Sequence, residues 1–228
     1  MKKSRVFRFF LPLLLLIAAC GGREEAAPAP AEIATPPAGL ARQTILVLGN
    51  SIAAGLGVEP EESFPGRLQQ FIDSTGLAFE VVNAGVSGET TAGGLGRIDW
   101  LLRQRVDVLI IELGGNDGLR GTVPEATKAN LVAIIERTRD RYPEADILLA
   151  GMQMPPNLGQ LYTERFREIF PEIAAEHDTH LVPFLLDRVG GVASLNQPDG
   201  IHPTPEGHHI VAETVWRYLE PVLRARML

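Results

Sequence analysis

Five short apolar runs, separated by segments with helical periodicity, constrain most strongly what this chain can fold into. The runs are rich in Val, Ile, Leu and Phe, which is typical of strands covered on both faces, and three of them end at Gly or Asn. They span residues 44–49, 79–83, 107–113, 146–151 and 180–184. Because predicted strands and helices alternate along the chain, we expect an α/β domain with a five-stranded parallel sheet.

The segments between these runs carry apolar residues at helical spacing. Ser63 is a candidate N-cap for the first predicted helix, and Thr91 is one for the second. The third helix places four residues on one face: Leu131, Ile134, Ile135 and Thr138. The predicted helices span residues 63–73, 91–104, 124–142, 161–176 and 205–224.

The N-terminal segment predicts export and attachment to a membrane. Basic residues at positions 2–8 precede an apolar run at 9–19, which is too short to span a bilayer comfortably. The run ends at Cys20, the single cysteine of the chain. Residues 16–20 resemble a bacterial lipobox, which implies that 1–19 is a lipoprotein signal peptide and that Cys20 carries the lipid. A plain N-terminal anchor or an ordinary secretory signal is the alternative.

Residues 20–41 are rich in Ala and Pro and predict a semi-rigid tether between the lipid and a folded domain at 42–228. The formal net charge is −7, and loss of the four basic residues in the signal peptide makes it −11. An acidic chain does not fit nucleic-acid binding. We expect a monomer in the bacterial cell envelope facing the periplasm, and Gly21 after the cysteine favours the outer membrane.

The segment Asp-Gly-Ile-His-Pro at 199–203 suggests a catalytic base. Asp199 can accept a hydrogen bond from one ring nitrogen of His202 and leave the other nitrogen free to take a proton. Such a base needs a nucleophile, and Ser51 follows the first predicted strand directly. The carboxyl ends of parallel strands share one edge of the sheet, so these groups can meet there. Taken alone, Ser51 would be read as a helix cap.

Two further loops follow the second and third predicted strands and contain Gly88 and Asn116. Attack of a serine on an acyl carbonyl creates an oxyanion, which needs hydrogen-bond donors already in place. The N–H groups of Ser51 and Gly88 and the side-chain amide of Asn116 can supply three. Separately, Gly88 and Asn116 would be read as turn residues.

Together, Ser51, Gly88, Asn116 and His202 resemble the four residues after which the SGNH hydrolases, or GDSL esterases, are named. The resemblance covers roughly residues 43–224. Its four blocks lie at residues 48–52, 83–90, 114–117 and 199–203. It implies a flavodoxin-like three-layer α/β/α fold, hydrolysis of esters or thioesters through an acyl-enzyme, and no metal or cofactor.

Residues 113–121 and 152–153 are similar to the bacterial periplasmic acyl-CoA thioesterase/lysophospholipase/arylesterase subgroup of that family. One departure is that Asn50 stands before Ser51 where the family usually has Asp. An amide loses the negative charge and gains hydrogen-bond donors, so we expect activity to survive with a different local network. Asp117 is expected to order its loop.

The substrate is predicted to be a small acyl ester or thioester, such as an aryl ester, acyl-CoA or lysophospholipid. Residues of the loop after the fourth predicted strand are candidates for an apolar wall along the acyl chain. They are Met152, Met154, Pro155 and Leu158. The alternatives are a carbohydrate O-acetyl esterase and an envelope-binding lipoprotein whose hydrolase site has decayed.

The remaining histidines are expected to have structural or surface roles. They are His177, His180, His208 and His209. The sequence shows no metal-ligand cluster and no phosphate-binding loop of the P-loop type.

Overall fold

The computed structural model describes residues 42–228, whose centre is a five-stranded sheet with the order β2-β1-β3-β4-β5. All four neighbouring pairs are parallel. The strands are β1 (Gln43–Gly49), β2 (Phe79–Gly85), β3 (Val108–Glu112), β4 (Asp146–Ala150) and β5 (His180–Val182). This is the flavodoxin-like strand order, so the predicted fold class is confirmed.

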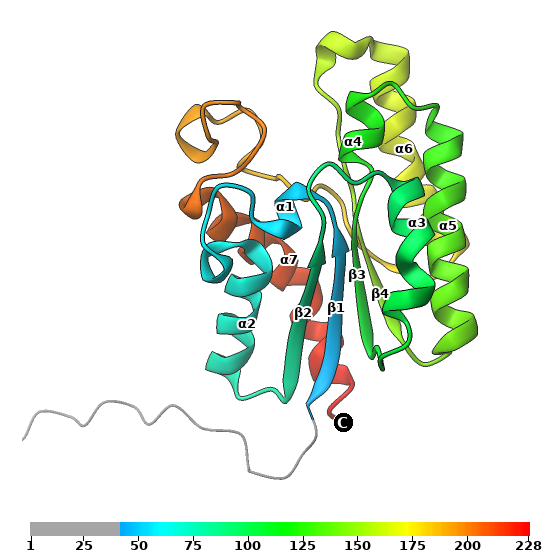
Figure 1. The fold of residues 1–228 in the computed structure, drawn as a ribbon, viewed down its shortest axis with the longest axis vertical. Coiled ribbons are helices and arrows are strands. Elements are labelled where there is room, and N and C mark those ends of the chain that lie inside the picture. Colours follow the sequence, from blue (N-terminus) through cyan, green and yellow to red (C-terminus); the bar gives the residue numbers. More distant parts are fainter. Residues whose placement is uncertain (1–41) are drawn as a thin grey trace, which may run out of the picture. The chain divides into compact units, whose positions relative to one another are not determined.

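Helices cover both faces of the sheet and complete three layers (Figure 1). One face carries α2 (Phe64–Thr75) and α7 (Pro205–Ala225), and the other carries α3 (Thr91–Leu101), α5 (Pro124–Arg141) and α6 (Gln160–Glu176). The short helices α1 (Ser51–Ala54) and α4 (Gly115–Leu119) follow β1 and β3. Three 3₁₀ turns lie at Pro60–Glu62, Pro156–Leu158 and Ala193–Leu195.

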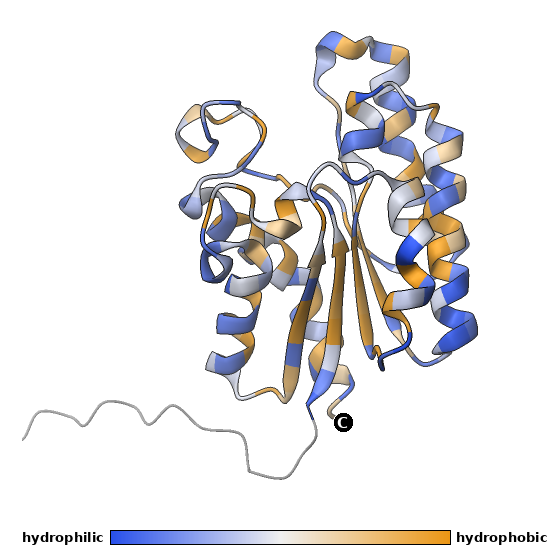
Figure 2. Ribbon diagram, in the orientation of Figure 1, coloured by the Kyte–Doolittle hydropathy of each residue, from blue (hydrophilic) through white to orange (hydrophobic). Residues whose placement is uncertain are grey.

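The hydrophobic core lies on both faces of the central strands, which are coloured as strongly hydrophobic in Figure 2. Every residue of β3 is buried, as expected for a strand between two helical layers. The predicted apolar face of α5 is also confirmed, because its four residues are fully buried. The sheet is therefore a rigid support for the loops at its edge.

The helix boundaries agree with the sequence to within two residues except at the C-terminal end of α3, and one of the two predicted caps is wrong. Ser63 caps α2 as predicted, accepting a hydrogen bond from the N–H of Gly66 at 3.3 Å. The prediction that Thr91 caps α3 is wrong, because Thr90 is the N-cap and accepts from the N–H of Gly93. The helix ends at Leu101 and not at residue 104, since tighter hydrogen-bonded turns follow it.

The last strand, β5, ends at Val182, before Pro183, which lacks a backbone N–H for further pairing. Among residues 42–228, no helix is long and apolar enough to cross a membrane. The predicted signal peptide, Cys20 and the tether lie outside the described residues.

Candidate active site

The carboxyl ends of β1, β2 and β3 bring Ser51, Gly88 and Asn116 to one edge of the sheet, as the parallel arrangement requires. The loop before α7 delivers Asp199 and His202 to the same place. Four segments that are far apart in the sequence therefore meet at a single site.

A continuous hydrogen-bonded relay joins Ser51, His202 and Asp199. The Oγ atom of Ser51 lies 2.8 Å from Nε2 of His202, and Nδ1 of the same ring lies 2.7 Å from Oδ2 of Asp199. Ser51 is buried with 8% exposure, while the carboxylate of Asp199 is partly open to solvent. These distances allow His202 to take the proton of Ser51 while Asp199 fixes its tautomer.

The Asp199 loop is shaped so that the carboxylate stays ionised. Gly200 has φ +73°, a left-handed conformation that suits glycine. The turn aims the N–H groups of Ile201 and His202 at Oδ1 of Asp199, at 2.9 and 3.1 Å. The backbone bond from Ile201, the side-chain bond to His202 and the backbone bond from His202 lower the pKa of Asp199 to about 2. The carboxylate therefore remains a hydrogen-bond acceptor at ordinary pH.

Gly88 and Asn116, two of the proposed oxyanion donors, lie in the loops after β2 and β3, at the same edge of the sheet as Ser51. Asn116 is oriented by a hydrogen bond from its Nδ2 to the carbonyl oxygen of Glu89, at 2.9 Å. This contact uses one of the two amide hydrogens and leaves the other to point elsewhere. Within residues 42–228, the N–H groups of Ser51 and Gly88 donate to no acceptor. Two backbone donors and one side-chain donor are thus available.

The Gly88 loop is held in place by charged side chains. Arg97 of α3 forms an ion pair with Glu89 and donates to the carbonyl oxygen of Ala84 at 2.6 Å. Arg120 donates to the carbonyl oxygen of Gly88 at 3.0 Å. Gly88 itself has φ +80°, a conformation that a residue with a side chain adopts at a cost. The position of its N–H therefore depends on contacts from Arg97 and Arg120.

Sequence reasoning missed Glu112, the last residue of β3, which is fully buried. Its carboxyl group accepts hydrogen bonds from the N–H of Asn50 at 2.9 Å, from the N–H of Ala53 at 3.1 Å and from Nδ2 of Asn50 at 2.7 Å. Burial raises the pKa of Glu112 to about 8. The available signal was a glutamate inside an otherwise apolar run, Val-Leu-Ile-Ile-Glu-Leu.

Residues 47–210 match the family model described as "GDSL-like Lipase/Acylhydrolase family". The chain belongs to this family. It is an ester hydrolase of the GDSL-like type, and the SGNH resemblance of its four sequence blocks is confirmed.

Two curated relatives and one solved structure illustrate the relationship. "Esterase TesA" of Pseudomonas aeruginosa is 44% identical over 184 residues, which cover 80% of this chain and 90% of the relative. "Thioesterase 1/protease 1/lysophospholipase L1" of Escherichia coli is 34% identical over 98% of both chains. A crystal structure of TesA has a TM-score of 0.76 and 43% identity, and covers 78% of this chain and 99% of its own.

The usual family residue before the nucleophile is replaced by Asn50, and the structure shows what the amide does. Its Oδ1 accepts from the N–H of Ile52 at 3.0 Å and lies 3.4 Å from Oγ of Ser51. Its Nδ2 donates to Glu112. The expectation of a different local network has this physical basis: an amide donates to a neighbouring carboxyl group, whereas an aspartate would meet it as a second acid.

Asp117 orders the neighbouring loop of this GDSL-like enzyme, as predicted. It is buried, and its carboxylate accepts from the N–H of Thr91 at 2.9 Å and from Oγ1 of Thr91 at 2.6 Å. Asn130 of α5 donates in turn to Oγ1 of Thr91. Thr91 therefore joins the start of α3 to the loop that carries Asn116.

The four candidates for an acyl-chain wall occupy different environments. Met152 is 4% exposed and belongs to the hydrophobic core, so it supports the loop from beneath. Met154 is half-buried and packs against Gly118, while Pro155 and Leu158 are exposed. Met154, Pro155 and Leu158 are therefore the candidates with surface available to a substrate.

The other histidines lie outside the Ser51 relay. His208 is fully buried, and its Nδ1 accepts from the N–H of Phe64 at 3.2 Å. Burial lowers the pKa of His208 to about 4, which keeps the ring neutral. His180 lies 3.5 Å from Asp146, and His209 lies 3.6 Å from Glu213 on the same helix.

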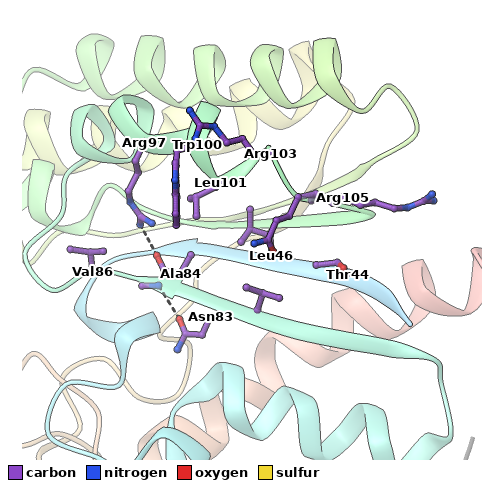
Figure 3. A pocket seen from close by; sticks show the side chains of 14 residues that line it. Thr44, Leu46, Asn83, Ala84, Val86, Arg97, Trp100, Leu101, Arg103 and Arg105 are labelled. Atoms are coloured by element: carbon purple, nitrogen blue, oxygen red, sulfur yellow. Dashed lines mark hydrogen bonds between the residues drawn. The ribbon is translucent and has the colours of Figure 1, made fainter. Parts of the chain in front are cut away.

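A cavity of about 380 Å³ lies between α3 and the edge of the sheet formed by β1 and β2. Figure 3 shows Arg97 and Trp100 on one side of it and Ala84 and Val86 on the other. None of the three relay residues lines the cavity. Two of its arginines are already engaged, Arg97 by Glu89 and Arg105 by Asp107. Across the part of the chain that the structure describes, no cluster of His, Cys, Asp or Glu could hold a metal ion.

Proposed function

We propose that this chain is a serine esterase and thioesterase in which Ser51 is the nucleophile, His202 the general base and Asp199 its orienting carboxylate. The observation that supports it most directly is the unbroken relay from Ser51 Oγ to His202 Nε2 and from His202 Nδ1 to Asp199. A serine hydroxyl reacts only when a base removes its proton, and the 2.8 Å distance between Ser51 Oγ and His202 Nε2 supports this role for His202.

The reaction proceeds through an acyl-enzyme. Ser51 Oγ attacks the carbonyl carbon while His202 takes the proton, and the oxyanion accepts hydrogen bonds from the N–H groups of Ser51 and Gly88 and from Asn116. The intermediate collapses, and His202 gives the proton to the departing alcohol or thiol. Water then attacks the acyl-enzyme while His202 takes a proton from the water. His202 returns this proton to Ser51 Oγ, and the carboxylic acid is released.

Substitution of the nucleophile tests this function. Ser51→Ala removes the attacking oxygen, and hydrolysis of nitrophenyl acetate, butyrate, octanoate and palmitate is expected to fall by at least about 10³-fold. Ser74→Ala is a matched control, because Ser74 is exposed on α2 and its hydroxyl bonds only to the carbonyl oxygen of Phe71. Near-normal turnover by Ser51→Ala would refute the assignment.

The same ester series separates the substrate classes. We infer that medium acyl chains are preferred, because Met154, Pro155 and Leu158 offer apolar surface in the loop after β4. Leu158→Asp is expected to weaken octanoate hydrolysis and to leave acetate hydrolysis unchanged. Activity confined to acetate in the unsubstituted protein would instead favour an O-acetyl esterase.

We propose that the enzyme is a lipid-anchored monomer of the cell envelope, with Cys20 as the lipidated residue and residues 1–19 as the signal peptide. Support comes from the basic and apolar segments before the single cysteine. Radiolabelled palmitate should enter the full chain expressed in a bacterium and should not enter Cys20→Ser. Fractionation of the envelope then tests whether the outer membrane holds it.

A further inference from the structure

We propose that Glu112 is a positioning residue for hydrolysis, and that it acts on Ser51 through the direction of the Asn50 side chain. This inference rests on the proposed role of Ser51 as nucleophile. Glu112 touches neither the Ser51–His202–Asp199 relay nor the oxyanion donors in its hydrogen bonds. Its effect on the reaction is therefore indirect and is confined to the turn that carries Ser51.

The carboxyl group of Glu112 holds that turn from two sides. Oε2 accepts from the N–H groups of Asn50 and Ala53, the residues immediately before and two positions after Ser51. These bonds connect the end of β3 to the turn after β1, which is its neighbour in the sheet. The nucleophile is thus tied to the sheet by a side chain from another strand, and not only by its own chain.

The third bond decides which way the Asn50 amide points. Because Nδ2 donates to Oε1 of Glu112, the Oδ1 atom faces Ser51 and the N–H of Ile52. The Ser51 hydroxyl then lies 2.8 Å from His202 and 3.4 Å from Asn50, so the base is its closer acceptor. A rotated amide would place an N–H₂ donor toward Ser51 and the N–H of Ile52 and would disrupt this arrangement.

The carboxyl group of Glu112 is closely packed in the protein interior. Glu112 has 0% exposure, and a Cβ atom on Gly49 would lie 2.6 Å from its Oε2. The same Cβ would also overlap the Cβ of Ala53, so glycine at position 49 is required by the packing of Ala53 and Glu112 and not by backbone conformation. A buried polar group whose partner is removed costs free energy, so replacement of either member of the pair disturbs the other.

The hydrogen bond from Asn50 to Glu112 can be reversed by exchanging the amide and the carboxyl group between the two positions. In Glu112→Gln, the new side-chain oxygen can still accept from the two backbone N–H groups, but its N–H₂ then faces the N–H₂ of Asn50. Two donors without an acceptor repel. In the double variant Asn50→Asp/Glu112→Gln, the new amide donates to the new carboxylate, whose other oxygen still accepts from the N–H of Ile52. Complementarity is restored with the charge moved to the neighbouring side chain.

Because the acceptor role belongs to the ionised carboxylate, the experiment compares kcat and KM for nitrophenyl butyrate at pH 9, above the pKa of Glu112, in the full chain and these two variants. Glu112→Gln is expected to lower kcat by about 10- to 100-fold with KM within about twofold, because a small displacement of a nucleophile has effects of this order. The double variant is expected to recover to within about threefold of the unsubstituted enzyme. Ile134→Val, which alters a buried side chain of α5, controls for loss of stability alone.

Either of two results would overturn the inference: a kcat for Glu112→Gln within twofold of the unsubstituted enzyme, or a double variant no more active than Glu112→Gln. If Glu112→Gln does not fold, Asn50→Ala provides the test, since it leaves both backbone bonds to Glu112 and removes only the oriented amide. It must then lower kcat with KM unchanged. Absence of Ser51-dependent activity in the unsubstituted enzyme would refute the proposed function instead, which distinguishes the two failures.

Discussion

The buried carboxyl group of Glu112 makes a quantitative prediction about stability and pH. Its pKa is raised from 4.5 to about 8 in the folded chain, chiefly by burial. The three hydrogen-bond donors around it, the N–H of Asn50, the N–H of Ala53 and the amide of Asn50, act in the opposite direction and are outweighed. Glu89 adds a smaller effect that favours the protonated form, and its own carboxylate is paired with Arg97.

The sign follows from where the proton is held. Between pH 4.5 and pH 8 the folded chain keeps a proton on Glu112 that the unfolded chain has lost. Its contribution to stability is therefore complete below pH 4.5 and is lost as the pH rises through 8. Each pH unit in this window is worth about 1.4 kcal/mol, so the free energy of unfolding should fall by about 4 kcal/mol from pH 5 to pH 9 through this one group.

The assay is urea-induced unfolding of residues 42–228 at pH 5, 7 and 9, followed by circular dichroism. Glu112→Gln cannot ionise, so its free energy of unfolding should lack this component even if it is lower at every pH. Glu80→Gln, an exposed glutamate on β2, serves as the matched control and should keep the pH dependence of the unsubstituted chain. The change in the free energy of unfolding from pH 5 to pH 9 is compared between Glu112→Gln and the unsubstituted chain. If the two changes differ by less than about 1 kcal/mol, the pKa of Glu112 is not raised in the folded chain and the reasoning is refuted.

Further predictions concern the residues around the relay. Asp199→Asn should lower kcat by about 10²- to 10⁴-fold with little change in KM, since an amide can hold His202 in the wrong tautomer; equal KM and kcat losses would contradict this. Asn116→Ala removes an oxyanion donor and should lower kcat by about 10²-fold in the same nitrophenyl ester assay. Gly88→Ala has space for its Cβ, with only Arg120 within 4 Å, so the φ of +80° should cost about 1–2 kcal/mol in urea unfolding without collapse of the fold.

Several parts of the fold were predictable because they depend on local chemistry. The apolar runs that became β1 and β3 require burial on both faces, and a glycine ends the first run at position 49 and follows the other at position 114. The buried face of α5 follows from residues spaced three and four apart. The start of α3 was harder to predict, because Thr90 and Thr91 can both cap a helix. Thr91 donates its hydroxyl group to Asp117, and Thr90 is the N-cap.

Strand order along the chain and the parallel direction of the strands are enough to predict that Ser51, Gly88, Asn116 and His202 occupy loops at one edge of the sheet. The contact between Asp199 and His202 could also be predicted, because the two residues are three positions apart and Gly200 allows a tight turn between them. The contact between Glu112 and Asn50, by contrast, could not be predicted from the sequence. That contact joins residues 62 positions apart, and it depends on the register of β1 against β3 and on the absence of a side chain at Gly49.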